Sequence, residues 1–127
     1  GSRLTSAIAA EKELLNYGIS STIVDARFAK PIDETLIDQL VNNHEAMITI
    51  EEGSIGGFAT QVMGYIMKKN YFSKNFKYKA LHFPDEFIDH DSSENQYIQA
   101  NITSNDIVNH SLNLLGSRAR IKHKQPA

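Results

Sequence analysis

The chain has 127 residues, of which 41% are hydrophobic and 22% are charged. These values predict one globular domain rather than two, and they exclude a wholly disordered chain. The net charge of −2 and the absence of cysteine exclude a general basic footprint for nucleic acid, disulfides, thiolate metal sites and a cysteine nucleophile. No apolar run approaches the length of a membrane-spanning helix.

The first half of the chain alternates helical and strand-like segments. Residues 4–17 predict a helix that begins after Ser2 as N-cap and ends before Gly18. The β-branched run 21–26 predicts a buried strand. Asp33 is expected to cap a second helix, and residues 46–52 predict a second strand. The apolar positions of that second helix are Leu36, Ile37, Leu40 and Val41.

The second half continues the alternation. A third helix is expected from Phe58 onward, because apolar residues recur there at helical spacing. After a polar and aromatic connection, residues 78–83 predict a third strand that Pro84 ends. The following stretch is expected to be mostly loop, with one helical turn near residues 95–100. A capping box of Thr103 and Asp106 predicts the last helix. Its apolar stripe is formed by Ile107, Val108, Leu112 and Leu115.

This order of elements predicts an α/β fold, a three-layer α/β/α sandwich with a largely parallel sheet. Residues 1–115 are expected to form the domain, and residues 116–127 a basic, flexible tail. Domains of this class normally open on a strand. Because this chain opens on a helix, a leading strand is missing from the expected pattern.

The stretch "ITIEEGSIGGFATQVM" (48–63) runs from a predicted strand through two carboxylates and a glycine turn into a predicted helix. Such a turn can bind a phosphate through backbone amides at the helix N-terminus. It matches neither a P-loop nor a dinucleotide-binding fingerprint, and Glu51 and Glu52 would repel a phosphate. Carboxylates there also favour the helix dipole without any ligand. The structural interpretation, a tight corner, is therefore preferred to an anion site.

A second candidate is the acidic segment "DEFIDHD" (85–91), whose carboxylates and histidine could bind a divalent metal. It lacks the spacing of an EF-hand loop, so a solvated acidic loop is preferred. The remaining histidines have no paired spacing, and no serine nucleophile elbow is present. The residues alone predict no catalytic, cofactor-binding or metal-binding side chain.

Three stretches, "STIVDARFAKPIDETLIDQL", "HEAMITIEEGSIGGFATQV" and "FPDEFIDH", together resemble the C-terminal domain of the 1-deoxy-D-xylulose-5-phosphate synthase family, within the transketolase superfamily. The resemblance covers about residues 1–115. One departure is Asp91, where the family usually has glycine. The residues that carry the resemblance, all assigned structural rather than catalytic roles, are Arg27, Pro31, Asp33, Glu51, Glu52, Gly53, Gly56, Gly57, Pro84, Asp85 and His90.

The resemblance implies a three-layer fold with a mixed, mostly parallel sheet of about five strands. It implies that the full-length enzyme is a cytoplasmic transferase of isoprenoid precursor synthesis, which uses thiamine diphosphate and magnesium. That enzyme condenses pyruvate with D-glyceraldehyde 3-phosphate. The cofactor and catalytic motifs of the family lie in its N-terminal and middle domains, so this chain alone is expected to bind no cofactor and to be inactive.

The expected partners are the N-terminal and middle domains and a second subunit of a homodimer, with no nucleic acid and no membrane. Packing and dimer stabilisation are the roles implied for this domain. Two alternatives stay open. The "EEG…GG" corner is shared with the β subunit of 2-oxoacid dehydrogenase E1 and with transketolase, and the glycine turn or the acidic loop could serve an independent anion- or metal-binding module.

Overall fold

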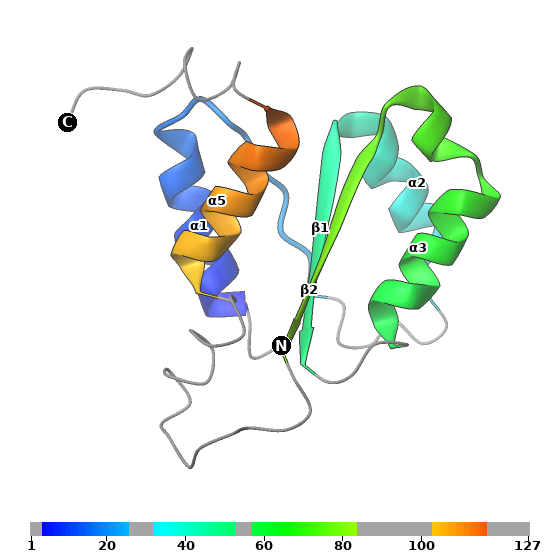
Figure 1. Cartoon of the computed structure of the whole chain (residues 1–127), viewed down its shortest axis with the longest axis horizontal. Coiled ribbons are helices and arrows are strands. Elements are labelled where there is room, and N and C mark those ends of the chain that lie inside the picture. The colour runs from blue at the N-terminus through cyan, green and yellow to red at the C-terminus, as the bar shows by residue number, and fades with distance from the viewer. Residues whose placement is uncertain (1–3, 26–31, 53–56, 84–102, 117–127) are drawn as a thin grey trace.

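A computed structural model describes residues 4–25, 32–52, 57–83 and 103–116. Figure 1 shows three layers, with α1 and α5 on one side of two strands and α2 and α3 on the other. The predicted α/β fold, with helices on both faces of parallel strands, is confirmed. In chain order the elements are α1 (Leu4–Leu15), α2 (Glu34–Asn43), β1 (Ala46–Glu52), α3 (Phe58–Lys68), the 3-10 helix η1 (Tyr71–Lys74), β2 (Lys77–Phe83) and α5 (Ser104–Leu115).

The strands β1 and β2 pair in parallel, from Ala46 opposite Lys77 to Glu52 opposite Phe83. Parallel strands need a crossover connection, and α3 with η1 provides it. These two strands make up the sheet of the described residues. The further strands that the family resemblance implies are not among these residues.

The side of the sheet under α1 and α5 has an aliphatic core. Alternate residues of a strand face opposite sides of a sheet, and Ile48, Ile50 and Leu81 all face this layer. The helices contribute their own apolar stripes to the same cluster. Its buried helical members are Ala10 and Leu14 of α1 and Ile107, Val108 and Leu112 of α5.

The side under α2 and α3 has a larger and more aromatic core. Ile66 and Val62 of α3 are almost fully buried, at 0% and 1% exposure. Tyr71 and Phe76 are buried as well, although the sequence predicts only a polar and aromatic connection there. η1 folds this connection back under α3, so its aromatic rings complete the second core. The other buried members are Ile37 and Tyr65.

The helix ends agree with the caps predicted from the sequence. Gly18 has a φ of 74°, and the amide of Ile19 donates to the carbonyl of Leu14 over 3.0 Å, as in a Schellman motif. The Asp33 carboxylate accepts from the amide of Leu36 at 3.0 Å. Thr103 and Asp106 form the predicted capping box at the start of α5.

The predicted strand at residues 21–26 is wrong over its described part, because residues 19–25 have no regular secondary structure. A β-branched run becomes a strand only where its backbone pairs with a neighbour, and propensity alone does not supply one. Side chains hold this segment instead. Thr22 Oγ1 lies 2.9 Å from Nε2 of His44, and Ile19 packs against the aliphatic core.

Several sequence expectations fall outside the described residues. They are the N-cap at Ser2, the end of the third strand at Pro84, the short helical turn near residues 95–100 and the flexible tail from residue 117 onward. Among the described residues, none of the helices is both long enough and apolar enough to cross a bilayer.

Candidate functional site

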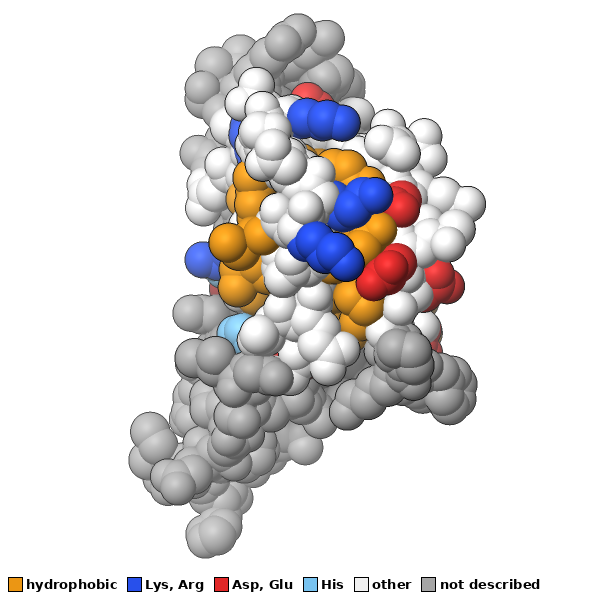
Figure 2. Space-filling model, turned by 90° about the vertical axis from the view of Figure 1, so that its right-hand side faces the viewer, with side chains coloured by type: hydrophobic (Ala, Val, Ile, Leu, Met, Phe, Trp, Pro, Cys, Tyr) orange, Lys and Arg blue, Asp and Glu red, His pale blue; other side chains and the backbone are white. Residues whose placement is uncertain are grey.

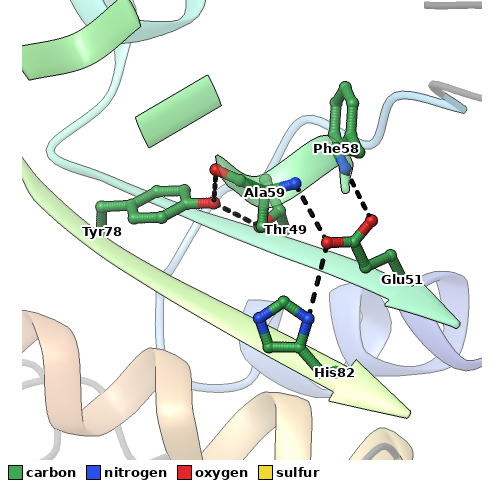
Figure 3. A network of polar contacts seen from close by, with 6 residues as sticks. All are labelled: Thr49, Glu51, Phe58, Ala59, Tyr78 and His82. Carbon is green, nitrogen blue, oxygen red and sulfur yellow. Dashed lines mark hydrogen bonds and ion pairs between the residues drawn. The ribbon is translucent and has the colours of Figure 1, made fainter. Parts of the chain in front are cut away.

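The polar corner between β1 and α3 is built around the carboxylate of Glu51 (Figure 3). Its Oε2 accepts a hydrogen bond from the amide of Phe58 at 2.9 Å, and its Oε1 accepts one from the amide of Ala59 at 3.0 Å. Those amides open α3 and have no partner within the helix. Glu51 thus caps α3 from the preceding strand, with a charge that suits the positive end of the helix dipole.

Gly57 is the residue that lets this carboxylate approach. A Cβ atom on Gly57 would lie 3.0 Å from Oε2 of Glu51, closer than such contacts normally are. The φ of Gly57 is −88°, so its role is to leave space rather than to adopt a left-handed conformation. Gly53 and Gly56, the other glycines of the turn, lie outside the described residues.

His82 of β2 approaches the same carboxylate from the neighbouring strand. Its Nδ1 lies 3.5 Å from Oε1 of Glu51, and the two side chains are 26% and 14% exposed. Nδ1 is shielded from solvent and makes no hydrogen bond to a described residue. The parallel register places Glu51 directly opposite His82, which explains why residues so distant in sequence meet here.

A second set of contacts continues the corner along the sheet. The hydroxyl of Tyr78 lies 2.5 Å from Oγ1 of Thr49 and 3.4 Å from the carbonyl oxygen of Ala59. Burial raises the pKa of the Tyr78 phenol, and the nearby Glu51 charge acts in the same direction. Both strands are therefore joined to the first turn of α3 through side chains that Figure 3 shows pointing toward one another.

This corner does not fit a diphosphate group. The two amides that would bind a phosphate already donate to Glu51, and the carboxylate would repel a second anion at that position. Within the described ranges, no three His, Asp or Glu side chains gather in a way that could hold a metal ion. We therefore derive no chemistry through thiamine diphosphate or magnesium at this corner.

A different polar cluster joins α2, α3 and η1. The hydroxyls of Tyr65 and Tyr71 both donate to Oδ1 of Asp38, over 2.9 Å and 2.5 Å. The hydrogen bonds from Tyr71 and Tyr65 hold the pKa of Asp38 below its usual range, and Lys69 adds to this effect. Each buried tyrosine in this layer thus finds an acceptor for its hydroxyl.

The same contacts raise the pKa of both tyrosines. Burial and the hydrogen bond to Asp38 raise the pKa of Tyr65 to about 12. For Tyr71 the hydrogen bond to Asp38 is the larger cause, and burial adds to it. A negative phenolate next to the Asp38 carboxylate is unfavourable, so both hydroxyls stay protonated donors over a wide pH range.

The structure places four of the predicted structural residues. Asp33 caps α2, Glu51 and Gly57 build the polar corner, and Glu52 ends β1. Seven others lie outside the described residues, namely Arg27, Pro31, Gly53, Gly56, Pro84, Asp85 and His90. Asp91 and the rest of the acidic segment 85–91 lie outside them as well, so the metal alternative stays untested there.

Sequence reasoning missed the partners of these residues. His82, Thr49 and Tyr78 read as ordinary strand residues, and only the register of β1 against β2 brings them to the corner. Asp38 is not singled out by any motif of the sequence. The tyrosines that it binds are separated from it by 27 and 33 residues, so local spacing gives no sign of the contact.

The family model described as "Transketolase, C-terminal domain" matches residues 1–107. A 1-deoxy-D-xylulose-5-phosphate synthase of Rhodobacter capsulatus is 40% identical over 107 residues, which are 84% of this chain. The chain spans 17% of the length of that relative. This chain therefore belongs to the transketolase C-terminal domain family.

Proposed function

We propose that the chain is the C-terminal domain of a 1-deoxy-D-xylulose-5-phosphate synthase. The observation that carries the proposal is the identity of 40% to such a synthase over 107 residues. The motifs "ARFAKPID" and "PDEFIDH" point to the same family. The whole enzyme would be a cytoplasmic transferase that condenses pyruvate with D-glyceraldehyde 3-phosphate, using thiamine diphosphate and magnesium held by its other domains.

Within such an enzyme, the role proposed for this domain is packing against the N-terminal and middle domains and stabilisation of a homodimer. The polar corner supports a structural role, because the carboxylate of Glu51 accepts from two amides of α3 and lies beside His82 of β2. Its hydrogen-bonding groups are satisfied within the domain or shielded from solvent. No side chain of the described residues is assigned to catalysis.

A chimaeric enzyme tests the proposal. The segment of the Rhodobacter capsulatus synthase that matches this chain is replaced by residues 1–107, and condensation of pyruvate with glyceraldehyde 3-phosphate is measured. We expect kcat/KM within about tenfold of the parent, since only packing contacts change. A folded chimaera as inactive as the relative without the segment would contradict the proposal and favour the transketolase or E1 β-subunit alternatives.

Calorimetry on the 127-residue chain tests the role of the domain separately. Titration with thiamine diphosphate and magnesium is expected to give no heat of binding, because the corner amides already donate to Glu51. Phosphate and calcium, titrated in turn, address the alternative of an independent binding module. Micromolar affinity for any of these ligands would show that the chain has a site of its own.

A further inference from the structure

The two nitrogens of the His82 imidazole lie in different surroundings. Nδ1 faces Oε1 of Glu51 at 3.5 Å, is shielded from solvent and makes no hydrogen bond to a described residue. The side chain as a whole is nevertheless 26% exposed. Figure 3 shows the second ring nitrogen, Nε2, on the side of the ring away from Glu51. Solvent therefore reaches the part of the ring that does not face the carboxylate.

The carboxylate of Glu51 decides which nitrogen of the neutral ring carries the proton. An unprotonated Nδ1 would direct its lone pair at a negative oxygen, at a position shielded from solvent, and the two would repel each other. A proton on Nδ1 turns the same contact into an attraction. The distance of 3.5 Å is longer than that of a usual hydrogen bond, so the preference is electrostatic. It leaves a free lone pair on Nε2.

Glu51 is itself held in place behind the ring. Its oxygens accept from the amides of Phe58 and Ala59 at 2.9 Å and 3.0 Å, and its side chain is only 14% exposed. The parallel register sets it opposite His82. A fixed carboxylate on one side of an imidazole orients the ring and stabilises the positive charge that forms when the other nitrogen gains a bond. The same pairing activates histidine for attack on an electrophile.

We propose that Nε2 of His82 is a modification site that accepts an acyl group, with Glu51 as its positioning residue. The donor is uncharged at its reacting end, as in an activated ester or anhydride, because the Glu51 charge repels phosphoryl donors and other anions. The inference goes beyond the packing role proposed for the domain. It rests on the geometry of His82 and Glu51 and does not depend on which enzyme contains the chain.

Acyl transfer to Nε2 needs no further protein group. The lone pair of Nε2 forms a bond to the carbonyl carbon of the donor, and the bond from that carbon to the leaving group breaks. The leaving group takes the electron pair of the broken bond. The ring keeps its Nδ1 proton and gains one positive charge, which lies beside the Glu51 carboxylate. Hydrolysis of the new bond later releases a carboxylic acid and a proton and restores the neutral ring.

Diethyl pyrocarbonate, an uncharged anhydride, is the probe for the 127-residue chain, with the rate at each histidine measured by peptide mass spectrometry. We expect His82 to react about tenfold faster than His110 of α5, which is also partly buried. Glu51→Gln keeps an acceptor oxygen but removes the charge. This variant should slow the reaction of His82 about tenfold and leave the rate at His110 unchanged.

Nitrogen NMR of the imidazole tests the positioning role of Glu51 directly. His82 of the native chain should show the tautomer with the proton on Nδ1, and Glu51→Gln should lose this preference. A purely structural role for Glu51 would leave the tautomer unchanged as long as the chain is folded, which circular dichroism checks.

Thr103→Ala is the matched control for lost stability. It removes a helix cap on the other layer but leaves Glu51 in place, so the rate at His82 should stay that of the native chain. A rate at His82 no higher than that at His110 would overturn the proposal. So would a Glu51→Gln chain that reacts as fast as the native one, or a native His82 whose proton resides on Nε2.

Discussion

The two faces of the sheet are stabilised in different ways. The layer under α1 and α5 is aliphatic, and its polar contacts are local caps such as Thr103 with Asp106. The layer under α2 and α3 is aromatic, and its polar contacts join residues far apart in sequence, such as Tyr71 with Asp38. A buried tyrosine must place its hydroxyl on an acceptor, whereas a buried leucine has no such requirement. The packing of the aromatic layer is therefore the more narrowly determined of the two, because each tyrosine hydroxyl must meet its acceptor.

The largest expected effect comes from the centre of the aromatic layer. Ile66 is fully buried, so Ile66→Ala is expected to cost about 2–5 kcal/mol of unfolding free energy through lost contacts and a cavity. Leu112→Ala in the aliphatic layer, at 6% exposure, should fall in the lower part of that range. Urea unfolding monitored by circular dichroism measures both. Ile66→Val is the conservative control. If Leu112→Ala lowered the unfolding free energy more than Ile66→Ala does, the expected order of the two cores would be wrong.

Substitutions in the polar corner are expected to cause the next largest loss of unfolding free energy. Glu51→Ala removes the acceptor of two α3 amides and is expected to cost about 1–2 kcal/mol. Thr103→Ala, which removes a local cap on the other layer, should cost about 1 kcal/mol. Glu51→Gln keeps an acceptor oxygen and should cost less than Glu51→Ala. Equal unfolding midpoints for Glu51→Ala and the native chain would contradict the capping role.

The space at Gly57 gives a sharper test of the same corner. Gly57→Ala places a methyl group 3.0 Å from Oε2 of Glu51 and is expected to cost about 1 kcal/mol, because the carboxylate must leave the amides. In a Glu51→Ala background the same substitution should cost close to nothing, since the clash is gone. The double-mutant cycle is measured by urea unfolding. Additive losses would show that Gly57 acts independently of Glu51.

The smallest predicted effect concerns pH and is confined to the aromatic layer. The pKa of Asp38 is lowered, so its contribution is present above its ordinary value and is lost as the pH falls through the lowered pKa. The pKa values of Tyr65 and Tyr71 are raised, so their contribution is lost as the pH rises above about 10. The midpoint of urea unfolding, followed from acid to alkaline pH, measures both windows.

Asp38→Asn serves as the control for this pH dependence. The native chain should be more stable than the variant at neutral pH, and the difference should shrink at both extremes, where either the carboxylate or the tyrosines change charge. Parallel profiles across the whole range would contradict the assigned contacts. The aliphatic layer contributes no matching dependence, because its buried residues carry no titratable group.

Elements that depend on local chemistry could be predicted from the sequence. Gly18, Asp33 and Thr103 mark helix ends through contacts within a few residues, and the strand at residues 46–52 has the predicted bounds. The predicted strand at residues 21–26 was wrong over its described part, because a strand needs a paired neighbour that the local sequence does not supply. The burial of Tyr71 and Phe76 was missed for a related reason, since a polar and aromatic connection gives no sign by itself that it folds back under α3.

The sequence by itself determined the α/β class, the caps of α2 and α5 and the family of the chain, because each depends on residue identity and short spacing. The tertiary structure alone decided the partners of those residues. Glu51 accepts from the first amides of α3 across the turn after β1, and the parallel register places His82 beside it. Asp38 became the shared acceptor of two tyrosines through the packing of α2 against α3. Such contacts join residues distant along the chain, and only folding brings them within hydrogen-bonding distance.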